Sequence, residues 1–294
     1  MTTVAVVAHA RKTMGGAGLL ELRRALEAEG VRDPLWFEVT KSKKAPRCAR
    51  AALRAGADLL FAWGGDGLVQ RCIDVIAGSP TTLAILPAGT ANLLATNLGV
   101  PLDVDAAVHA GLHGERRRLD VGRINGECFA VMAGAGFDAR MIGDADDGLK
   151  ERIGRLSYVW TGTTNLRSKP FKATISVDGA HWFRGKASCL LVGNVGSLFG
   201  GLEVFTDARP DDGLLDLGVV TADGILEWLR TLARTAVGTP ANSPFVQTTK
   251  AHTVTAKLSR KITYEIDGGD RGKTRRLKIG IRPGAVEVCV PAAA

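Results

Sequence analysis

The feature that most constrains this chain is an apolar run that ends in a cluster of glycines. Residues 59–63 are apolar and are bounded by turn residues, which predicts a buried strand. Gly64, Gly65, Asp66 and Gly67 follow, and apolar residues then recur at helical spacing over residues 68–76. Glycines at a strand-to-helix junction let the backbone turn sharply, and the free N–H groups of the first helical turn favour an anion. The placement suits a nucleotide phosphate.

This glycine loop differs from two common phosphate-binding motifs. A Walker loop needs a Lys-Ser/Thr pair after its last glycine, where this chain has Leu68 and Val69, and the dinucleotide pattern G-x-G-x-x-G is absent. An acidic side chain in a phosphate loop is unfavourable without a cation or a hydrogen bond, so Asp66 indicates magnesium or a sugar or phosphoryl hydroxyl. A tight turn with a capping Asp explains this stretch equally well.

Length and residue types exclude several classes of protein. With 294 residues the chain can hold one large domain or two ordinary ones. Its apolar runs are too short to cross a bilayer, and its start lacks a basic segment and a cleavage site, so we expect a cytoplasmic location. The five cysteines include no C-x-x-C pair, and the five histidines show no ligand spacing. This predicts buried free thiols, with neither a disulfide framework nor a zinc site.

The chain is basic, with a formal net charge of +8. Basic residues cluster at 41–47, 116–118 and 273–276. Such charge fits a nucleotide, a nucleic acid or an anionic membrane surface, and it equally fits a solvated face. Aromatic residues are few and no nucleic-acid motif occurs, so we expect no nucleic-acid partner.

The first 120 residues predict an α/β domain. Strands are expected at residues 4–8, 35–39, 59–63 and 82–86, with helices at 19–26, 46–55, 68–76 and 93–98. This alternation indicates a parallel sheet with helices on both faces. Glycine-bearing turns follow three of the strands, at residues 9–16, 64–67 and 87–92. Ligands of such folds bind at the carboxyl ends of the strands, so the convergence of these turns favours the phosphate interpretation.

The rest of the chain, residues 121–294, predicts a mainly antiparallel β-sandwich domain. Asn125-Gly126 and Asp178-Gly179 predict tight hairpins between strands at 118–124 and 127–132, and at 171–177 and 181–192. A glycine turn is expected at 133–138, and helices at 149–166 and 225–237. Further strands are expected at 214–220, 253–258, 262–266, 277–281 and 286–290. Whether the last strand returns to the first domain is left open.

Six ordered motifs resemble the diacylglycerol-kinase-like lipid kinases of bacteria, which share their nucleotide fold with NAD kinases. The resemblance covers essentially the whole chain, and the closing residues 282–286 also look like those of the family. The motifs occupy residues 64–67, 86–92, 120–122, 133–139, 211–216 and 264–268. A lone G-G-D-G would be weak evidence, whereas six motifs at family-like intervals are strong evidence.

The resemblance implies ATP-dependent transfer of the γ-phosphoryl group to a lipid hydroxyl, with ATP bound between the two domains. On matching positions, the phosphates would be held by Gly64, Gly65, Asp66 and Gly67. The nucleotide would also be contacted by Thr40, Thr90 and Asn92. A structural Mg²⁺ would be held by Asp212 and the carbonyl of Leu214.

The chain departs from the family at the proposed general base. The family has Asp-Gly-Glu where this chain has Asp267-Gly268-Gly269, and the missing Glu is that base. Asp270 follows and is the best available base, although on a regular strand a shift of one residue points it to the other face. A solvated turn residue is an equally good interpretation of Asp270. Leu68 also replaces a family Thr, and Leu93 replaces a family Asp.

We therefore predict a transferase of phospholipid metabolism, a lipid kinase that depends on ATP and Mg²⁺. Asp66 and Asp270 are its candidate catalytic residues. A peripheral location at the inner membrane surface is expected, with Lys41, Lys43 and Lys44 near anionic lipid or the γ-phosphate. Two alternatives stay open: a catalytically impaired, nucleotide-binding regulator of the same fold, and a kinase for a soluble hydroxylated substrate such as NAD. The particular lipid and the oligomeric state are not predicted.

Overall fold

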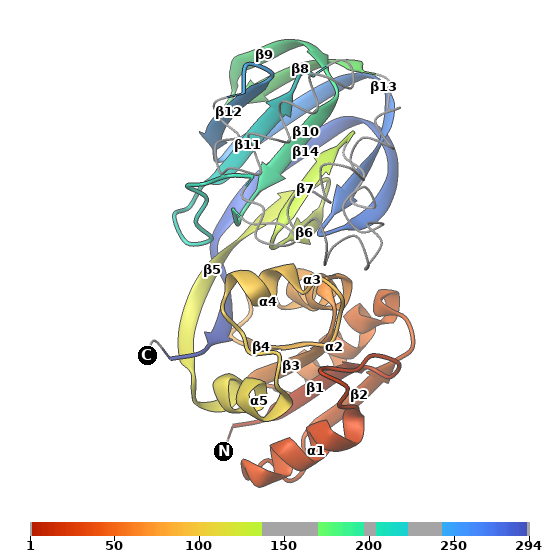
Figure 1. The fold of residues 1–294 in the computed structure, drawn as a ribbon, viewed down its shortest axis with the longest axis vertical. Coiled ribbons are helices and arrows are strands. Elements are labelled where there is room, and N and C mark those ends of the chain that lie inside the picture. The colour runs from red at the N-terminus through yellow and green to blue at the C-terminus, as the bar shows by residue number, and fades with distance from the viewer. Residues whose placement is uncertain (1, 137–169, 197–203, 223–242, 293–294) are drawn as a thin grey trace, which may run out of the picture. The chain divides into compact units, whose positions relative to one another are not determined.

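The computed structural model of this chain describes residues 2–136, 170–196, 204–222 and 243–292. The chain divides into two compact units, and each is described by itself (Figure 1). Unit 1 comprises Met1–Val121 and Arg282–Ala294, and unit 2 comprises Gly122–Ile281. Two strands, β5 (Glu115–Ile124) and β14 (Gly269–Val290), contribute residues to both units. The helices expected at 149–166 and 225–237 lie outside the described residues.

Unit 1 contains the predicted parallel sheet. Its strands follow the order β14-β4-β3-β1-β2, and each of the printed pairings in it is parallel. The end of β14 joins this sheet where Val288 pairs with Leu83 of β4. The other strands are β1 (Val4–His9), β2 (Leu35–Val39), β3 (Leu59–Gly64) and β4 (Thr82–Pro87). These four confirm the predicted strands within one residue at each end.

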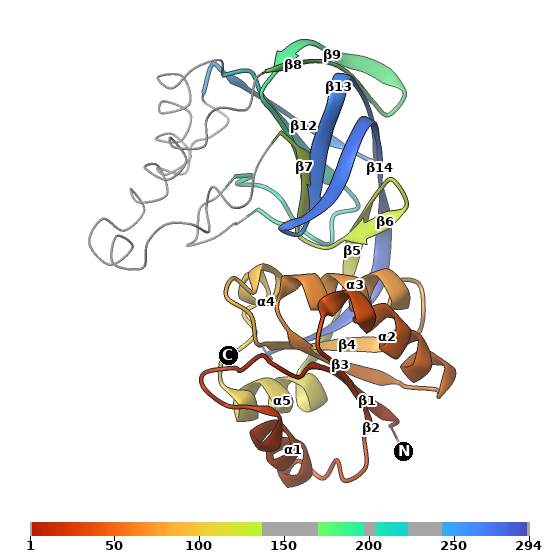
Figure 2. The ribbon, with the colours of Figure 1, turned by 90° about the vertical axis from the view of Figure 1, so that its right-hand side faces the viewer.

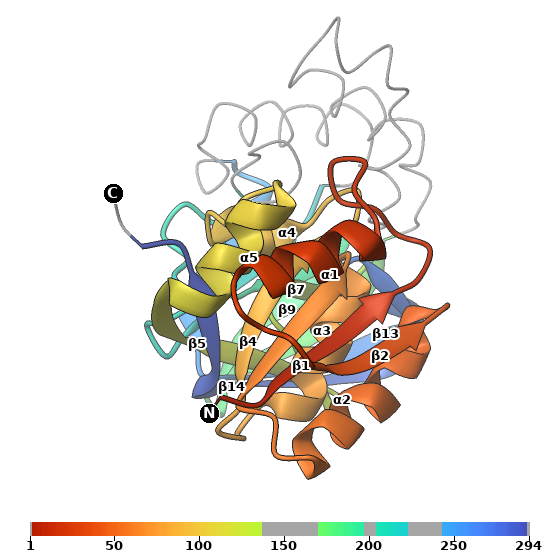
Figure 3. The ribbon, with the colours of Figure 1, turned by 90° about the horizontal axis from the view of Figure 1, so that it is seen from below.

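Helices cover both faces of this sheet (Figures 2 and 3). α1 (Leu19–Ala28) and α5 (Val104–His113) lie on one face, and α2 (Ala45–Arg54) and α3 (Asp66–Ile76) lie on the other. A short turn, η1 (Ser42–Lys44), precedes α2, and α4 (Leu93–Asn97) follows β4. The sequence patterns did not predict α5. Its start carries a helix signal, because the Asp103 carboxylate accepts a hydrogen bond from the Ala106 N–H at 2.9 Å.

The strand order places a switch point between β1 and β3. The chain leaves β1 for α1 on one face of the sheet and leaves β3 for α3 on the opposite face. A crevice opens at the carboxyl ends of two such strands, and ligands of doubly wound folds bind there. The fold therefore selects the loops after β1 and β3 as candidate site loops.

Unit 2 is the predicted antiparallel β-sandwich. One series of paired strands runs β12-β11-β10-β7-β13, and a second runs β9-β8-β13-β14. Between them lies an apolar core that includes Phe129, Phe171, Ile175, Leu190 and Leu217. The remaining strands are β6 (Glu127–Phe129), β7 (Met132–Ala135), β8 (Phe171–Val177), β9 (Ala180–Ala187), β10 (Cys189–Gly193), β11 (Leu215–Val220), β12 (Val246–Ala251) and β13 (Thr253–Ile266).

Several expected elements of unit 2 differ from the observed ones. The strands expected at 253–258 and 262–266 form one strand, β13, whose register shifts between Lys257 and Ile262. The first part of β13 pairs with β8 and its end pairs with β7, so the irregularity joins the two strand series. The strands expected at 277–281 and 286–290 are both parts of β14. β12 was not predicted at all.

The glycine turn expected at 133–138 was wrong for its described part. Residues 133–135 lie in β7, paired on one side with β10 and on the other with β13. A Cβ at Gly134 would collide with the carbonyl oxygen of Leu190, so this glycine permits close approach of two strands. The expected second strand of the first hairpin also ends early, because β6 stops at Phe129.

Tight hairpin turns were predicted correctly. Asn125 and Gly126 have φ values of 49° and 100°, and Asp178 and Gly179 have values of 49° and 84°. Positive φ at both central residues is the requirement that favours Asn-Gly and Asp-Gly. Asp267-Gly268 makes the same turn between β13 and β14, with φ values of 43° and 75°.

The buried carboxylate of Asp267 ties this third turn to the segment between β6 and β7. It accepts hydrogen bonds from the N–H groups of Ala130 (2.9 Å), Val131 (3.0 Å) and Met132 (2.9 Å). The Asp267 N–H in turn donates to the Met132 carbonyl at 2.9 Å. Hydrogen bonds to a charged group are among the stronger ones, so this carboxylate fixes the entry to β7.

Asp267→Asn should lower the free energy of unfolding by about 1–3 kcal/mol, because one of the three buried N–H groups then faces an amide NH₂. Asn keeps the left-handed backbone that the turn requires. Urea unfolding measures the change. Asp178→Asn is the matched control: Asp178 occupies the same turn position and accepts from the N–H groups of His252 and Thr253, but it is exposed. Equal losses in both variants would contradict the role of burial.

Candidate functional site

Two glycine loops meet at the carboxyl edge of the unit 1 sheet. β3 ends in Gly64, which lies beside Pro87 at the end of β4, and the Ala88 N–H donates to the Gly64 carbonyl at 3.1 Å. A Cβ at Gly89 would collide with the Cα of Gly65 and would lie 2.6 Å from the Asn92 Oδ1. These glycines are therefore required for the close approach of the two loops.

Asn92 closes the loop that follows β4. Its buried side chain accepts from the Gly89 N–H at 2.9 Å and donates to the carbonyls of Gly89 (2.9 Å) and Pro87 (3.3 Å). Its φ of 49° lies in the left-handed region, which Asn tolerates better than most residues. With these bonds made, Thr90 is left exposed at the tip of the loop.

Asp66 lies between the two loops. It is the first residue of α3, and its Oδ1 accepts from the Leu94 N–H in α4 at 3.4 Å. Burial raises the pKa of Asp66, while the N–H groups of Leu94, Leu93 and Asn92 oppose that shift. A carboxylate at two helix N-termini is favoured by their partial positive charge. Asp66 therefore links the G-G-D-G loop to the start of α4.

The loop after β1 completes this edge of the sheet. The Trp63 Nε1–H of β3 donates to the Lys12 carbonyl at 3.0 Å, so the buried indole spans the switch point. Arg11 and Lys12 are exposed there. The pKa of His9 is lowered by its burial and by the charge of Lys12. Sequence reasoning did not identify Trp63 as a residue of the site.

Thr40 lies farther along the same edge. It directly follows β2, and β1 separates β2 from β3. Neighbouring strands are about 4.8 Å apart, which puts Thr40 roughly 10 Å from the G-G-D-G loop within the sheet. It is exposed, as are Lys41, Lys43 and Lys44. The structure thus brings Gly64, Gly65, Asp66, Gly67, Thr90 and Asn92 together, with Thr40 two strands away.

Asp270 belongs to unit 2, at the start of β14. It pairs with Glu265 of β13, and the preceding Gly269 pairs with Ile266. Directly opposed residues share a face, so Asp270 lies on the face of Glu265 and position 269 lies on the face of the buried Ile266. Asp270 itself is exposed. The Asp270 side chain therefore lies on the face of β14 opposite to that of a side chain at position 269.

Arg271 covers the position where the family Glu would stand. A Cβ on Gly269 would lie 2.7 Å from the Arg271 Nη1, and this nitrogen donates to the Gly269 carbonyl at 3.0 Å. The Arg271 Nε donates to the Glu127 carboxylate at 2.7 Å, and the arginine side chain is only 12% exposed. The Arg271 guanidinium group therefore links position 269 to the Glu127 carboxylate, which sequence reasoning missed.

Asp212, one of the two predicted Mg²⁺ ligands, lies beside a different cation, the ammonium group of Lys250. The Lys250 Nζ lies 3.0 Å from the Asp212 Oδ2 and 3.2 Å from the Asp216 Oδ2, and it donates to the Asp207 carbonyl at 3.1 Å. The other Asp212 oxygen accepts from the Leu214 N–H at 3.0 Å. Burial alone would lower the pKa of Lys250, but Asp212 and Asp216 raise it overall. Because the Lys250 ammonium group already supplies a positive charge to Asp212 and Asp216, we expect no divalent ion here in the wild type.

The two units together have the architecture of the NAD kinase-like class of folds. The model of the diacylglycerol kinase catalytic domain matches residues 4–124, and that of the YegS C-terminal NAD kinase beta sandwich-like domain matches residues 131–290. A probable lipid kinase YegS-like of Pseudomonas fluorescens is 32% identical over 278 residues, covering 92% of this chain and 91% of the relative. A diacylglycerol kinase of Bacillus subtilis is 30% identical over 228 residues, covering 76% and 75%. The chain therefore belongs to the family of YegS-like and diacylglycerol lipid kinases.

Solved structures agree on the fold. A putative diacylglycerol kinase from Bacillus anthracis superposes with a TM-score of 0.80 at 23% identity, covering 98% of this chain and 95% of that one. An NAD kinase from Archaeoglobus fulgidus in complex with ATP gives a TM-score of 0.54 at 11% identity, covering 98% and 93%. Among the described residues, no helix has both the length and the apolar character needed to cross a membrane.

Asp66→Asn should become more stable relative to the wild type as the pH rises. Burial raises the folded-state pKa of Asp66 above its unfolded value, so the protonated side chain favours folding at low pH, and this contribution is lost as the pH rises through the folded pKa. Urea unfolding of both proteins at about pH 4.5 and about pH 7.5 measures this coupling between proton binding and folding. Asp74→Asn, an exposed change on the same helix, should show no such trend. The opposite trend would mean that the loop N–H groups outweigh burial.

Lys250→Met should destabilise unit 2 by about 1 kcal/mol, because Asp212 and Asp216 then face each other without a cation. Millimolar Mg²⁺ or Ca²⁺ should restore part of this loss in the variant and leave the wild type unchanged, as thermal unfolding would show. Lys257→Met, on an exposed position of β13, is the matched control. If divalent ions raised the melting temperature of the wild type but not that of Lys250→Met, the prediction of a Mg²⁺ site at Asp212 and Leu214 would be supported instead.

Proposed function

We propose that this protein transfers the γ-phosphoryl group of ATP, supplied with Mg²⁺, to the hydroxyl of a diacylglycerol-like lipid. The observation that carries this proposal is the pair of glycine loops locked together beside the switch point of unit 1. Such loops offer backbone N–H groups and a helix N-terminus to phosphate oxygens. Family membership and the ATP complex of the Archaeoglobus fulgidus NAD kinase support the choice of nucleotide.

Each loop has a distinct task in this proposal. Gly65 and Gly67 let the phosphates approach the start of α3, while Asn92 holds the neighbouring loop and presents Thr90. Thr40 reaches the nucleotide from the end of β2, and Lys12 adds positive charge from the loop after β1. Mg²⁺ would neutralise the charge of the triphosphate. Asp66 holds the two loops together through its bond to the Leu94 N–H.

The general base is the least conventional part of the proposed mechanism. Phosphoryl transfer needs a group that accepts the proton of the attacking hydroxyl. Asp270 is exposed beside the turn. Glu127 is bound by the same Arg271 guanidinium group that covers position 269, where other members of the family carry the base. We retain Asp270 as the base and treat Glu127 as the rival that the experiment must separate from it.

A lipid substrate places the protein at the inner membrane surface as a peripheral protein. Exposed Lys41, Lys43 and Lys44 follow β2, and each basic residue near an anionic surface contributes about 1 kcal/mol of attraction. One specific observation favours the rival function of a nucleotide-binding regulator: Arg271 occupies the place of the family base. A kinase for a soluble substrate such as NAD is the other rival.

The decisive assay supplies γ-labelled ATP and Mg²⁺ to vesicles with and without diacylglycerol, and to NAD in the absence of vesicles. We expect label in the lipid only. Asp66→Ala should abolish turnover, and Asp74→Ala should retain it. Asp270→Asn should lower kcat by roughly 10²–10⁴-fold, the usual contribution of a general base, with a small change in KM. Glu127→Gln should have a much smaller effect.

Other outcomes of this assay redirect the proposal. A large loss in Glu127→Gln with a small one in Asp270→Asn would move the base to Glu127. Label in NAD but not in lipid would replace the substrate class. ATP binding without a labelled product in any lipid or in NAD would make the protein a regulator.

A further inference from the structure

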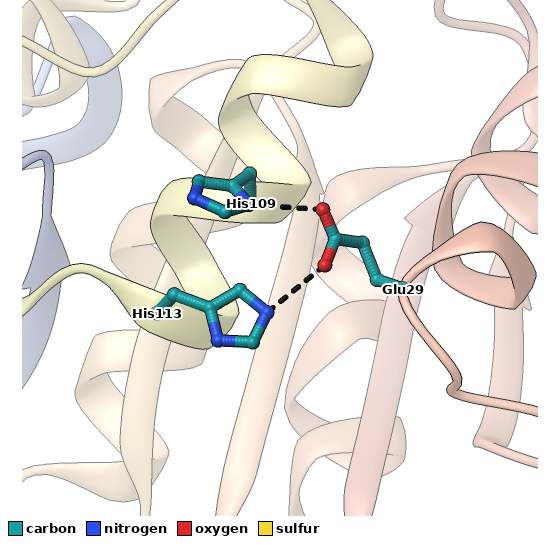
Figure 4. Close-up of side chains that lie close together, drawn as sticks. All are labelled: Glu29, His109 and His113. Carbon is teal, nitrogen blue, oxygen red and sulfur yellow. Dashed lines mark hydrogen bonds and ion pairs between the residues drawn. The ribbon is translucent and has the colours of Figure 1, made fainter.

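Three potential metal ligands meet on unit 1, between the ends of α1 and α5 (Figure 4). The Glu29 carboxylate lies between two imidazoles, with Oε1 2.9 Å from the His109 Nδ1 and Oε2 2.9 Å from the His113 Nε2. One ligand atom from each of the three side chains lies within 4.8 Å of the others. The three donors therefore converge on one point of the surface.

The sequence explains this convergence. His109 and His113 are four residues apart in α5, so they project from the same face of the helix. Their ring centroids are 4.8 Å apart. Glu29 directly follows α1, which packs beside α5 on the same face of the sheet. The expectation that the histidines show no ligand spacing was therefore wrong for this pair.

The backbone that carries the ligands is held on both helices. The Glu29 N–H donates to the Ala25 carbonyl at 3.2 Å, and Gly30 then leaves the helix with a φ of 83°. On α5, the Gly114 N–H donates to the Ala110 carbonyl at 2.9 Å, and a Cβ at Gly114 would collide with the Val290 carbonyl. Only the side chains of Glu29, His109 and His113 need to adjust when an ion enters.

The cluster lies at the amino ends of the unit 1 strands, whereas the glycine loops lie at their carboxyl ends. α1 returns from the carboxyl end of β1, and a short connection leads from Glu29 to the start of β2 at Leu35. The six residues of β3 are roughly 17 Å long, which is the approximate distance between the two ends of the strands. An ion at this cluster is therefore separate from the phosphate site and would act on the packing of α1 and α5.

We propose that Glu29, His109 and His113 bind one divalent transition-metal ion, zinc being the best match, which clamps α1 to α5. Two imidazole nitrogens and one carboxylate oxygen are a donor set that Zn²⁺ accepts, with a fourth position left for water. Ligand bonds of about 2.0–2.2 Å place tetrahedral donors roughly 3.4 Å apart. Small side-chain rotations reach this spacing from the present separations, which are 2.9 Å for each Glu29–His contact and at most 4.8 Å within the donor set. Mg²⁺ and Ca²⁺ prefer oxygen ligands and do not match this set. Both imidazoles are exposed, so an ion can enter from solvent.

Calorimetric titration of the untagged, chelator-treated protein with ZnCl₂ tests the proposal. We expect one zinc ion per chain, a higher melting temperature with zinc, and no heat from MgCl₂. His109→Ala, His113→Ala and Glu29→Gln should each weaken binding by at least about tenfold, since even loss of an outer-shell partner costs 10–100-fold. Zinc should no longer raise the melting temperature of His113→Ala.

Two control variants separate this site from incidental binding. His181→Ala removes an exposed histidine from β9, and Cys48→Ser removes a partly exposed thiol, and both should bind zinc as the wild type does. Absence of binding by the wild type would overturn the proposal. So would wild-type affinity in His113→Ala, or loss of binding in Cys48→Ser. Because the readouts are heat and melting temperature, they do not depend on the proposed kinase activity.

Discussion

The contact between Gly65 and Gly89 is the constraint on which the candidate site depends. A side chain at position 89 would separate the loops after β3 and β4 and would also collide with the Asn92 Oδ1. The bond between Asp66 and the Leu94 N–H requires those loops to touch. The backbone that would face a phosphate is consequently fixed by the protein itself. A site that is shaped before the ligand arrives loses less conformational entropy on binding.

The family motifs meet one another in space, often from far apart in the sequence. The G-G-D-G loop touches residues 87–92, and Asp267 binds residues 130–132, which directly precede the motif at 133–139 and lie 135–137 positions away. Asp120, at the end of unit 1, accepts from the Gly284 N–H at 2.7 Å across 164 positions. In these contacts the motif side chains bind backbone groups. Much of what makes the family recognisable in this chain therefore stabilises its loops, which in turn position the groups that the proposed chemistry needs.

The sequence predicted unit 1 well because its signals are local. Strand-to-helix alternation, helix-ending glycines and the Asn-Gly and Asp-Gly turns each act within a few residues. One exception, α5, was missed although its capping signal is local, whereas the exceptions in unit 2 depend on pairing between distant strands. Lys250 pairs directly with Asp216 across β11 and β12, and since β12 was not predicted, no pattern could place this ammonium beside Asp212. The bulge in β13 could not be predicted either, because it depends on the pairing of β13 with β8, β7 and β14.

The surroundings of position 269 could be predicted in part from the sequence. Alternation along a strand puts residues 269 and 271 on one face, so the approach of Arg271 to Gly269 follows from their spacing. That Glu127 holds the arginine depends on tertiary packing and could not be foreseen. The His109–His113 spacing was visible in the sequence, but only the packing of α1 beside α5 adds Glu29 to it.

The course of β14 has a consequence for the order in which the protein is made. Its last residues complete the unit 1 sheet at the edge of β4, where Val286, Val288 and Cys289 are buried. They follow all of unit 2 along the chain. On the ribosome, residues 1–121 therefore emerge before unit 2 with the edge of β4 unpaired, and this edge stays unpaired until the sandwich has been synthesised. Most of unit 1 is therefore translated before unit 2, but its sheet is completed after unit 2.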